Sequence, residues 1–228
     1  MTNVISLDDV EKTYHISDDV QVNALRGISF SVKKGEFLAV VGKSGSGKST
    51  AMNMIGCLDY PTNGIIRLDG KDTIRMQEST LAQLRGKKIG FIFQKFNLIQ
   101  SLTALENVML PMIFQGVSRD VRIKKATKIL TLVGLDHRLD HRPSQLSGGE
   151  SQRVAIARSL SNDPDVILAD EPTGNLDSKT GRQIMDLLNK LNKEEGKTII
   201  MITHDDHLAK EAERIIRLKD GEIIKHDK

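Results

Sequence analysis

A short segment rich in glycine and serine constrains the fold of this chain more than any other feature. Residues 42–50 read Gly-Lys-Ser-Gly-Ser-Gly-Lys-Ser-Thr, which fits the pattern Gly, any four residues, Gly, Lys, then Ser or Thr. The preceding run, residues 36–41, is a predicted buried strand, and residues 51–55 can open a helix. In this strand–loop–helix setting the motif cradles nucleotide phosphates, so we expect ATP or GTP here, the alternative being an ordinary Gly/Ser surface turn.

Each part of the motif has a physical role in holding phosphate. Gly42, Gly45 and Gly47 let backbone N–H groups converge on the phosphates, and the helix N-terminus adds positive dipole. We expect Lys48 to reach the β- and γ-phosphates and Ser49 to ligate Mg²⁺. The remaining hydroxyl residues of the predicted nucleotide-binding set are Ser44, Ser46 and Thr50.

Composition and charge describe an ordinary globular protein. With 228 residues, of which 39% are hydrophobic, the chain can bury a substantial core without disulfides. A formal net charge of +3 is too small to indicate nucleic acid as a partner. The single cysteine, Cys57, lies among apolar residues, which favours a small core residue in a reducing compartment over a redox role.

The sequence contains no recognisable targeting or membrane-spanning segment. Residues 1–10 include acids and no sustained apolar run. The longest apolar stretches, such as residues 37–41 and 199–202, are far shorter than the ~18 residues that a membrane helix needs. We therefore expect a cytoplasmic protein whose membrane role comes through a partner.

The order of apolar segments predicts an α/β fold with a mainly parallel core sheet. Short runs rich in Val and Ile, separated by helical patterns, recur at residues 38–41, 89–93, 166–169 and 198–202. Such runs are typical of parallel strands buried on both faces. Near the N-terminus, residues 4–7 and 28–32 alternate like half-exposed strands, which predicts a small antiparallel β-subdomain beside the nucleotide site.

Two hairpins and a helical insert complete the predicted organisation. Turn signals at Asp69-Gly70 and Asp220-Gly221 each separate two strand-like segments. From residue 102 to residue 139, apolar residues fall at helical spacing, which predicts a helical insert over about residues 95–145. Within this insert we expect breaks near Pro111, Gly116 and Gly134. With no internal repeat, we interpret residues 1–228 as a single nucleotide-binding domain with an α-helical subdomain insert.

A second motif, residues 166–171, ends an apolar strand in two acids. Asp170 at the strand end can reach Mg²⁺ through water, as phosphoryl-transfer sites of this class require. Glu171 would lie beyond the metal, where a carboxylate can act as general base toward the attacking water. Acids at strand ends are common in loops, but beside the phosphate loop this pair indicates nucleotide hydrolysis.

Residues 146–153 place a serine and two adjacent glycines at the start of a predicted helix. Such an end binds anions, yet the chain already has a phosphate loop, so a second end makes sense if it faces another subunit's nucleotide. Leu-Ser-Gly-Gly followed by Gln-Arg-Val-Ala-Ile-Ala-Arg resembles the signature motif of ATP-binding cassette (ABC) ATPases. The alternative is a plain helix cap that contains glycine.

Other landmarks of that family fall in order along nearly the whole chain. The resemblance implies that Tyr14 stacks on adenine, that Gln94 senses Mg²⁺ and water, and that His204 lies near the γ-phosphate. Each could instead be an ordinary polar or half-buried residue. The resemblance also implies that Asp177 crosses a dimer interface, whereas we interpret His207 as a helix-surface residue.

The family resemblance further implies a homodimer that encloses two ATP molecules head to tail. Each nucleotide would be held by Lys48 and Ser49 of one copy, and the other copy would contribute Ser147, Gly148 and Gly149. One position departs from the usual pattern, because Glu150 stands where the family most often has Gln. A carboxylate there would repel the partner's phosphates unless it points away or pairs with a neighbour, for which Arg153 is a candidate.

Three segments most resemble the macrolide and lipoprotein exporter group of the family: residues 52–59, 102–108 and 169–178. This implies an ATPase subunit that drives a separate integral membrane permease in export or extraction of a macrolide, lipoprotein or antimicrobial peptide, at the inner face of the cell membrane. Phe96 and Leu98 suit a groove for a short permease helix, or burial in this chain's own core.

Other functions stay open at this stage. A cassette ATPase of the same group can regulate a cell-wall hydrolase through a membrane partner without transport. Soluble cassettes that act on DNA or ribosomes usually carry a long coiled-coil insertion or two cassettes, and this sequence has neither. A nucleotide kinase would not need residues 146–150.

Overall fold

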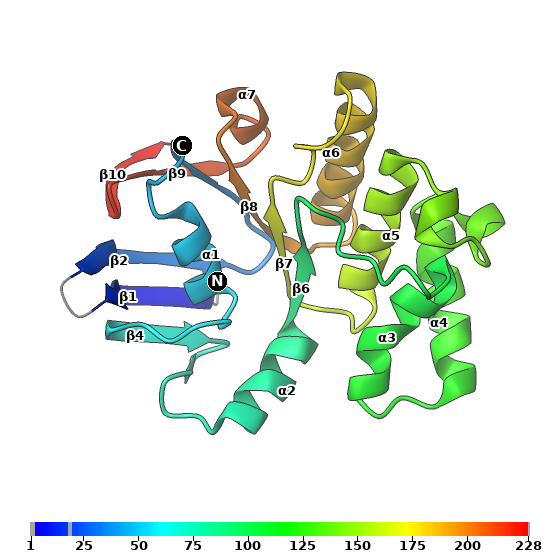
Figure 1. Ribbon diagram of the computed structural model, residues 1–228, viewed down its shortest axis with the longest axis horizontal. Coiled ribbons are helices and arrows are strands. Elements are labelled where there is room, and N and C mark those ends of the chain that lie inside the picture. The colour runs from blue at the N-terminus through cyan, green and yellow to red at the C-terminus, as the bar shows by residue number, and fades with distance from the viewer. Residues whose placement is uncertain (1–2, 18–19, 228) are drawn as a thin grey trace.

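The computed structural model describes residues 3–17 and 20–227, which form two sheets and seven α-helices. An antiparallel sheet lies at one side, the main sheet runs through the middle, and most helices gather at the other side (Figure 1). The predicted domain limits, residues 1 and 228, lie outside the described residues. Among the helices described, none is long and apolar enough to cross a membrane.

The main sheet confirms the predicted parallel core. Its order is β10-β9-β3-β8-β7-β6, and only β10 runs antiparallel to its neighbour. The strands are β3 (Phe37–Val41), β6 (Ile89–Ile92), β7 (Val166–Asp170), β8 (Thr198–Thr203), β9 (Arg214–Lys219) and β10 (Glu222–Asp227). All four apolar runs predicted as parallel strands are in this sheet.

Alternation along the core strands divides the apolar core into two layers. In β3, Phe37, Ala39 and Val41 pack with the helical side, whereas Leu38 and Val40 pack with the antiparallel sheet. Successive side chains of a strand point to opposite faces, and both faces are covered, so every residue of β3 and of β8 is buried. This explains why their sequences are continuous apolar runs.

The second sheet confirms the predicted antiparallel layer and contains one of the two predicted hairpins; the other joins β9 to β10 in the main sheet. The order of the second sheet is β2-β1-β4-β5, from β1 (Asn3–Ser17), β2 (Val20–Lys33), β4 (Asn63–Leu68) and β5 (Lys71–Asp72). Strands β1 and β2 are longer than the predicted segments, since their pairing continues through several register shifts into polar residues. The turns Asp69-Gly70 and Asp220-Gly221 have positive φ at both residues, as two-residue hairpins require.

The helices follow the predicted plan with one correction. They are α1 (Lys48–Ile55), α2 (Glu78–Lys88), α3 (Ala104–Phe114), α4 (Arg119–Leu132), α5 (Gly148–Leu160), α6 (Ser178–Lys193) and α7 (Asp206–Ala209), with short 3₁₀ turns η1 (Asp136–Arg138) and η2 (Pro143–Gln145). Helices α3 and α4 form the insert, and the chain breaks at Gly116 and Gly134, both at positive φ.

The expected break at Pro111 is wrong, because α3 continues through it to Phe114. A proline inside a helix costs about 3 kcal/mol. Val108 and Met112, on either side of it, are fully buried, and each such burial contributes about 1.5–3 kcal/mol. Packing of this face therefore outweighs the local cost. Cys57 is also buried, as predicted, and burial raises the pKa of its thiol to about 11.

Candidate functional site

A cleft of about 900 Å³ collects most of the predicted site residues from distant parts of the chain. Its lining includes Tyr14, Ser44, Gly45, Gly47, Lys48, Ser49, Thr50, Gln94, Asp170, Glu171 and His204. The sequence reasoning missed Arg26 and the backbone of Ala24, which line the cleft from β2. Neither residue belongs to a sequence motif, so no signal in the sequence pointed to them.

The phosphate loop joins β3 to α1, as the sequence predicts. Gly47, the residue before α1, has φ of +98°, and a Cβ there would lie 2.6 Å from the carbonyl oxygen of Ala24. A side chain is therefore excluded by both conformation and space. Gly42 and Ser46 do not line the cleft: Ser46 is 5% exposed, and its hydroxyl occupies the space beside Gly42. These two residues pack against each other on the side of the loop that faces away from the cleft.

Lys48 already points into the phosphate loop. Its Nζ donates hydrogen bonds to the carbonyl oxygens of Gly42, at 2.6 Å, and Lys43, at 2.9 Å. An ammonium group has three donors and no acceptor, so these two carbonyl oxygens satisfy two of its donors and hold the charge at the loop.

Asp170 and Glu171 lie at the carboxyl end of β7, beside the end of β8. Burial raises the pKa of Asp170, the Glu171 charge raises it further, and Lys48 lowers it. A carboxylate so placed is stabilised by a nearby cation. Ser49 and Gln94 line the same cleft, and hydroxyl, amide and carboxylate oxygens are ligands that Mg²⁺ accepts. The predicted metal set therefore fits the ion.

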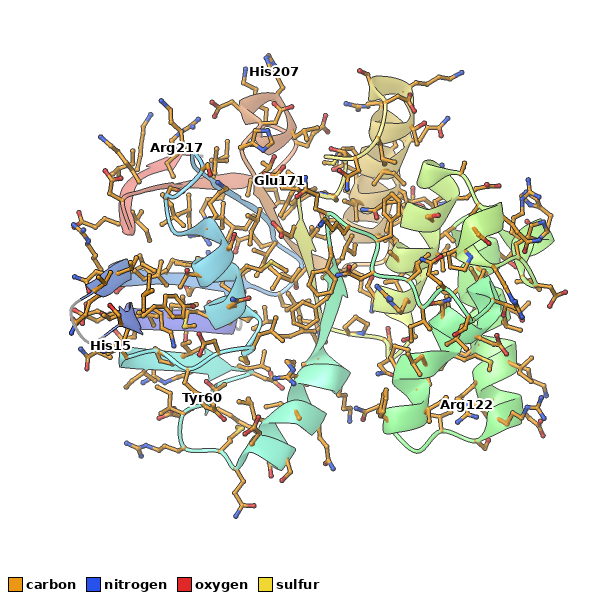
Figure 2. All side chains as sticks on the ribbon, viewed as in Figure 1. His15, Tyr60, Arg122, Glu171, His207 and Arg217 are labelled. Atoms are coloured by element: carbon orange, nitrogen blue, oxygen red, sulfur yellow. The ribbon has the colours of Figure 1, made fainter. Side chains whose placement is uncertain are left out.

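Glu171 and His204 meet directly, although they are far apart in sequence. Glu171 Oε1 lies 2.6 Å from His204 Nδ1 and accepts the His204 backbone N–H at 3.0 Å. Thr203 Oγ1 donates to the other carboxylate oxygen at 3.3 Å. Glu171 also has φ of +44°, in the left-handed region, where non-glycine residues mark strain at functional sites. Figure 2 shows Glu171 near the middle of the molecule, whereas His207 lies exposed on α7 at its edge.

Tyr14 lies on β1 at the side of the cleft, held by two residues that sequence reasoning missed. Its hydroxyl donates to Asp59 Oδ2 at 3.0 Å, and Lys12 Nζ lies 4.9 Å from the ring centroid. Lys12 also binds Asp59 Oδ1 at 2.9 Å. Residues 12 and 14 share one face of the strand, but nothing in the sequence points to Asp59. Burial, followed by the Asp59 hydrogen bond, raises the pKa of Tyr14.

The remaining predicted residues, Ser147, Gly148, Gly149 and Asp177, lie outside the cleft. Ser147 caps α5: its Oγ accepts the Glu150 N–H at 3.2 Å, and Glu150 Oε2 accepts the Ser147 N–H at 2.8 Å. Asp177 caps α6 by accepting the N–H groups of residues 179 and 180, each at 3.0 Å. The space beside Gly149 is bounded by Thr180 of α6, so the two caps belong to one surface.

The pairing expected between Glu150 and Arg153 is wrong. Arg138 on η1 takes that place, with its Nε 2.8 Å from Glu150 Oε1. Arg153 instead donates to the carbonyl oxygen of Val133 at 3.1 Å. The physical reason is that Glu150 bends back to cap its own helix, which turns its carboxylate away from the next helical turn and toward η1.

A separate groove of about 560 Å³ lies between the α2–β6 region and α3, with α5 at its side. Its apolar lining includes Phe91, Phe93 and Phe114, the last 78% exposed. Phe96 and Leu98, predicted for such a groove or for the core, do not line this groove. Both line a second groove of about 570 Å³ that also borders Leu146 and Gly148. Leu98 is at the same time 8% exposed and part of the core, against which Phe96 packs.

Comparisons with known proteins agree with this geometry. The family model described as ABC transporter matches residues 25–174. An uncharacterized ABC transporter ATP-binding protein of Thermotoga maritima is 53% identical over 223 residues, covering 98% of this chain and 94% of that protein. A macrolide export ATP-binding/permease protein, MacB of Aggregatibacter actinomycetemcomitans, is 50% identical over 222 residues, and the match covers 97% of this chain but 34% of that protein.

Solved structures support the same assignment. The ATP-binding cassette MJ0796 of Methanocaldococcus jannaschii has been solved as a dimer in a post-hydrolysis state bound to ADP and Pi. That structure matches with a TM-score of 0.90 and 50% identity over 98% of each chain. The family match covers more than half of the sequence, and both nucleotide motifs meet in one cleft. The chain therefore belongs to the ABC transporter family and is one of its ATPase cassettes.

Proposed function

We propose that this chain is the ATP-hydrolysing subunit of a membrane exporter and that it works as a homodimer around two ATP molecules. One observation carries the dimer: the signature residues Ser147, Gly148 and Gly149 lie outside the cleft that holds Lys48 and Glu171. A second copy, placed head to tail, would bring its signature end and its Asp177 to this cleft. The dimer of the similar MJ0796 cassette supports this arrangement.

In the proposed reaction, Lys48 exchanges its carbonyl partners for the β- and γ-phosphates of ATP. Ser49, Asp170 and Gln94 would hold Mg²⁺, which neutralises charge that develops on the phosphate oxygens. The Tyr14 ring would stack on the adenine. The remaining hydroxyl and N–H groups of the loop, in residues 44–50, would hold the phosphates.

Glu171 would take a proton from the attacking water as general base. Its Oε1 lies 2.6 Å from His204 Nδ1, so this carboxylate oxygen must turn from the imidazole toward the water during the cycle. His204 is then free to donate to phosphate oxygens as charge redistributes in the transition state. Loss of the γ-phosphate would remove the contacts shared by the two copies and let the dimer open.

A membrane permease is the proposed partner. The groove lined by Phe91, Phe93 and Phe114 suits the apolar face of a short helix. The name of the MacB relative gives it macrolide export, ATP-binding and permease functions, which supports a permease as partner. We propose a macrolide, lipoprotein or antimicrobial peptide as cargo, and the MacB name supports the macrolide. With such a partner, the protein would work at the inner face of the cell membrane.

The dimer is tested by light scattering on the purified Glu171→Gln variant with and without Mg²⁺ and ATP, beside ATPase assays of the unmodified protein. We expect a monomer that becomes a dimer only with ATP, because the variant binds ATP but lacks the general base. Hydrolysis by the unmodified protein should be slow and should vanish in the variant. A persistent monomer despite demonstrated ATP binding would contradict the proposed arrangement.

A further inference from the structure

A chain of polar contacts links the signature end of α5 to η1. Glu150 uses one carboxylate oxygen to accept the Ser147 N–H at 2.8 Å and the other to accept Arg138 Nε at 2.8 Å. The backbone N–H of Glu150 in turn donates to Ser147 Oγ. The orientation of the serine hydroxyl therefore depends on Glu150, and that of Glu150 depends on Arg138.

Arg138 is itself held from the other side. Its NH1 lies 3.0 Å from His141 Nε2, and because a guanidinium can only donate, this nitrogen is the acceptor in the contact. The carbonyl oxygen of His141 accepts the N–H of Ala104, the first residue of α3. Arg138 is thus anchored to the helical insert while it reaches Glu150.

The charge of Glu150 makes this contact important at the dimer interface. The Ser147 N–H, and then Arg138, hold the pKa of Glu150 below its usual value, so the side chain is an anion at neutral pH. Its side chain is 22% exposed and that of Arg138 is 35% exposed, so water screens the pair only partly. In the proposed dimer this anion would lie at the helix end that faces the partner's triphosphate.

We propose that Arg138 is a positioning residue for ATP-driven dimerisation: it neutralises Glu150 and keeps it in the cap, which leaves Ser147 and the α5 N-terminus able to receive the partner copy's nucleotide. This rests on the proposed homodimer. Arg138 itself does not line the cleft of its own chain, so ATP binding by the monomer does not depend on it.

The test compares four proteins in the Glu171→Gln background: no further change, Arg138→Gln, Glu150→Gln, and both changes together. The dimer dissociation constant is measured with Mg²⁺ and ATP by analytical ultracentrifugation, and ATP affinity of the monomer with a fluorescent trinitrophenyl-ATP probe. Arg138→Gln should weaken dimerisation about tenfold, because an unpaired anion then faces the triphosphate, and leave probe binding unchanged. Glu150→Gln should restore dimerisation of the double variant to within about twofold, because glutamine keeps the cap without the charge.

The results distinguish a positioning role of Arg138 from a purely structural one. If Arg138→Gln dimerises as well as its parent, or if the double variant is no better than Arg138→Gln, the positioning role is wrong. A purely structural role predicts no rescue, since the double variant has lost the ion pair as well. Should Arg138→Gln not fold, the double variant and Arg138→Lys, which keeps the charge, give the same comparison. If the Glu171→Gln parent itself stays monomeric while it binds the probe, the homodimer fails, and the role of Arg138 fails with it.

Discussion

Replacing Gly149 with alanine should destabilise the protein, whereas the same change at Gly148 should not. A Cβ added at Gly149 would lie 2.5 Å from Cγ2 of Thr180, far inside normal carbon contact. At Gly148 the nearest atom, Cδ2 of Leu176, would be 3.4 Å away. Both residues are in the first turn of α5 and neither has positive φ, so the two changes differ mainly in space.

The size of the effect follows from two opposing contributions. Overpacking costs about 1–3 kcal/mol, and replacing glycine by alanine in a helix gains up to about 1 kcal/mol. Both variants gain the same helix propensity, so the difference between their free energies of unfolding measures the steric clash alone. We expect Gly149→Ala to be less stable than Gly148→Ala by about 1–3 kcal/mol, or about 2–12 °C in midpoint temperature for a chain of this size.

Urea unfolding followed by circular dichroism measures this difference, because the chain has no tryptophan for fluorescence. Thr180→Ser is the matched control: serine lacks Cγ2 but keeps the hydroxyl and the backbone N–H that caps α6 with Asp177. The double variant Gly149→Ala/Thr180→Ser should recover most of the lost stability. Equal stability of the two alanine variants, or no recovery with serine, would refute the steric reasoning.

Two further substitutions test the contacts that hold Tyr14 beside the cleft and the ion pair between Lys88 and Asp165. Asp59→Ala releases Tyr14 and Lys12, and the loss of about 1 kcal/mol of positioning should raise the KM for ATP about fivefold with kcat within twofold in steady-state assays. An unchanged KM would show that Tyr14 is placed without Asp59. Lys88, 2.6 Å from Asp165, holds the pKa of that carboxyl below its usual value. Its contribution is therefore complete above the unfolded pKa near 4 and is lost as pH falls through the lower folded pKa. Lys88→Met should cost about 1 kcal/mol in urea unfolding at pH 7 and much less at pH 3; an equal cost at both would exclude the ion pair.

Contacts between distant residues account for what could not be predicted. Arg138 was missed as the partner of Glu150 because the two residues are 12 positions apart in sequence and only the packing of η1 against the start of α5 brings them together. Asp59 was missed because it approaches Tyr14 through the pairing of β1 with the segment that leads into β4. Likewise, the break expected at Pro111 depends on local backbone cost, and burial on the two sides of the proline decided against it.

Sequence patterns were enough to predict the phosphate loop, the acids at the end of β7, the parallel strands and the family, because these depend on neighbouring residues and on periodicity within one element. Tertiary structure alone decided which side chains meet: Glu171 with His204, Glu150 with Arg138, and the separation of the signature end from the cleft. These contacts depend on how whole helices and strands pack against one another. Packing determines which residues distant in sequence come within hydrogen-bond distance, and which surfaces stay exposed for a second copy.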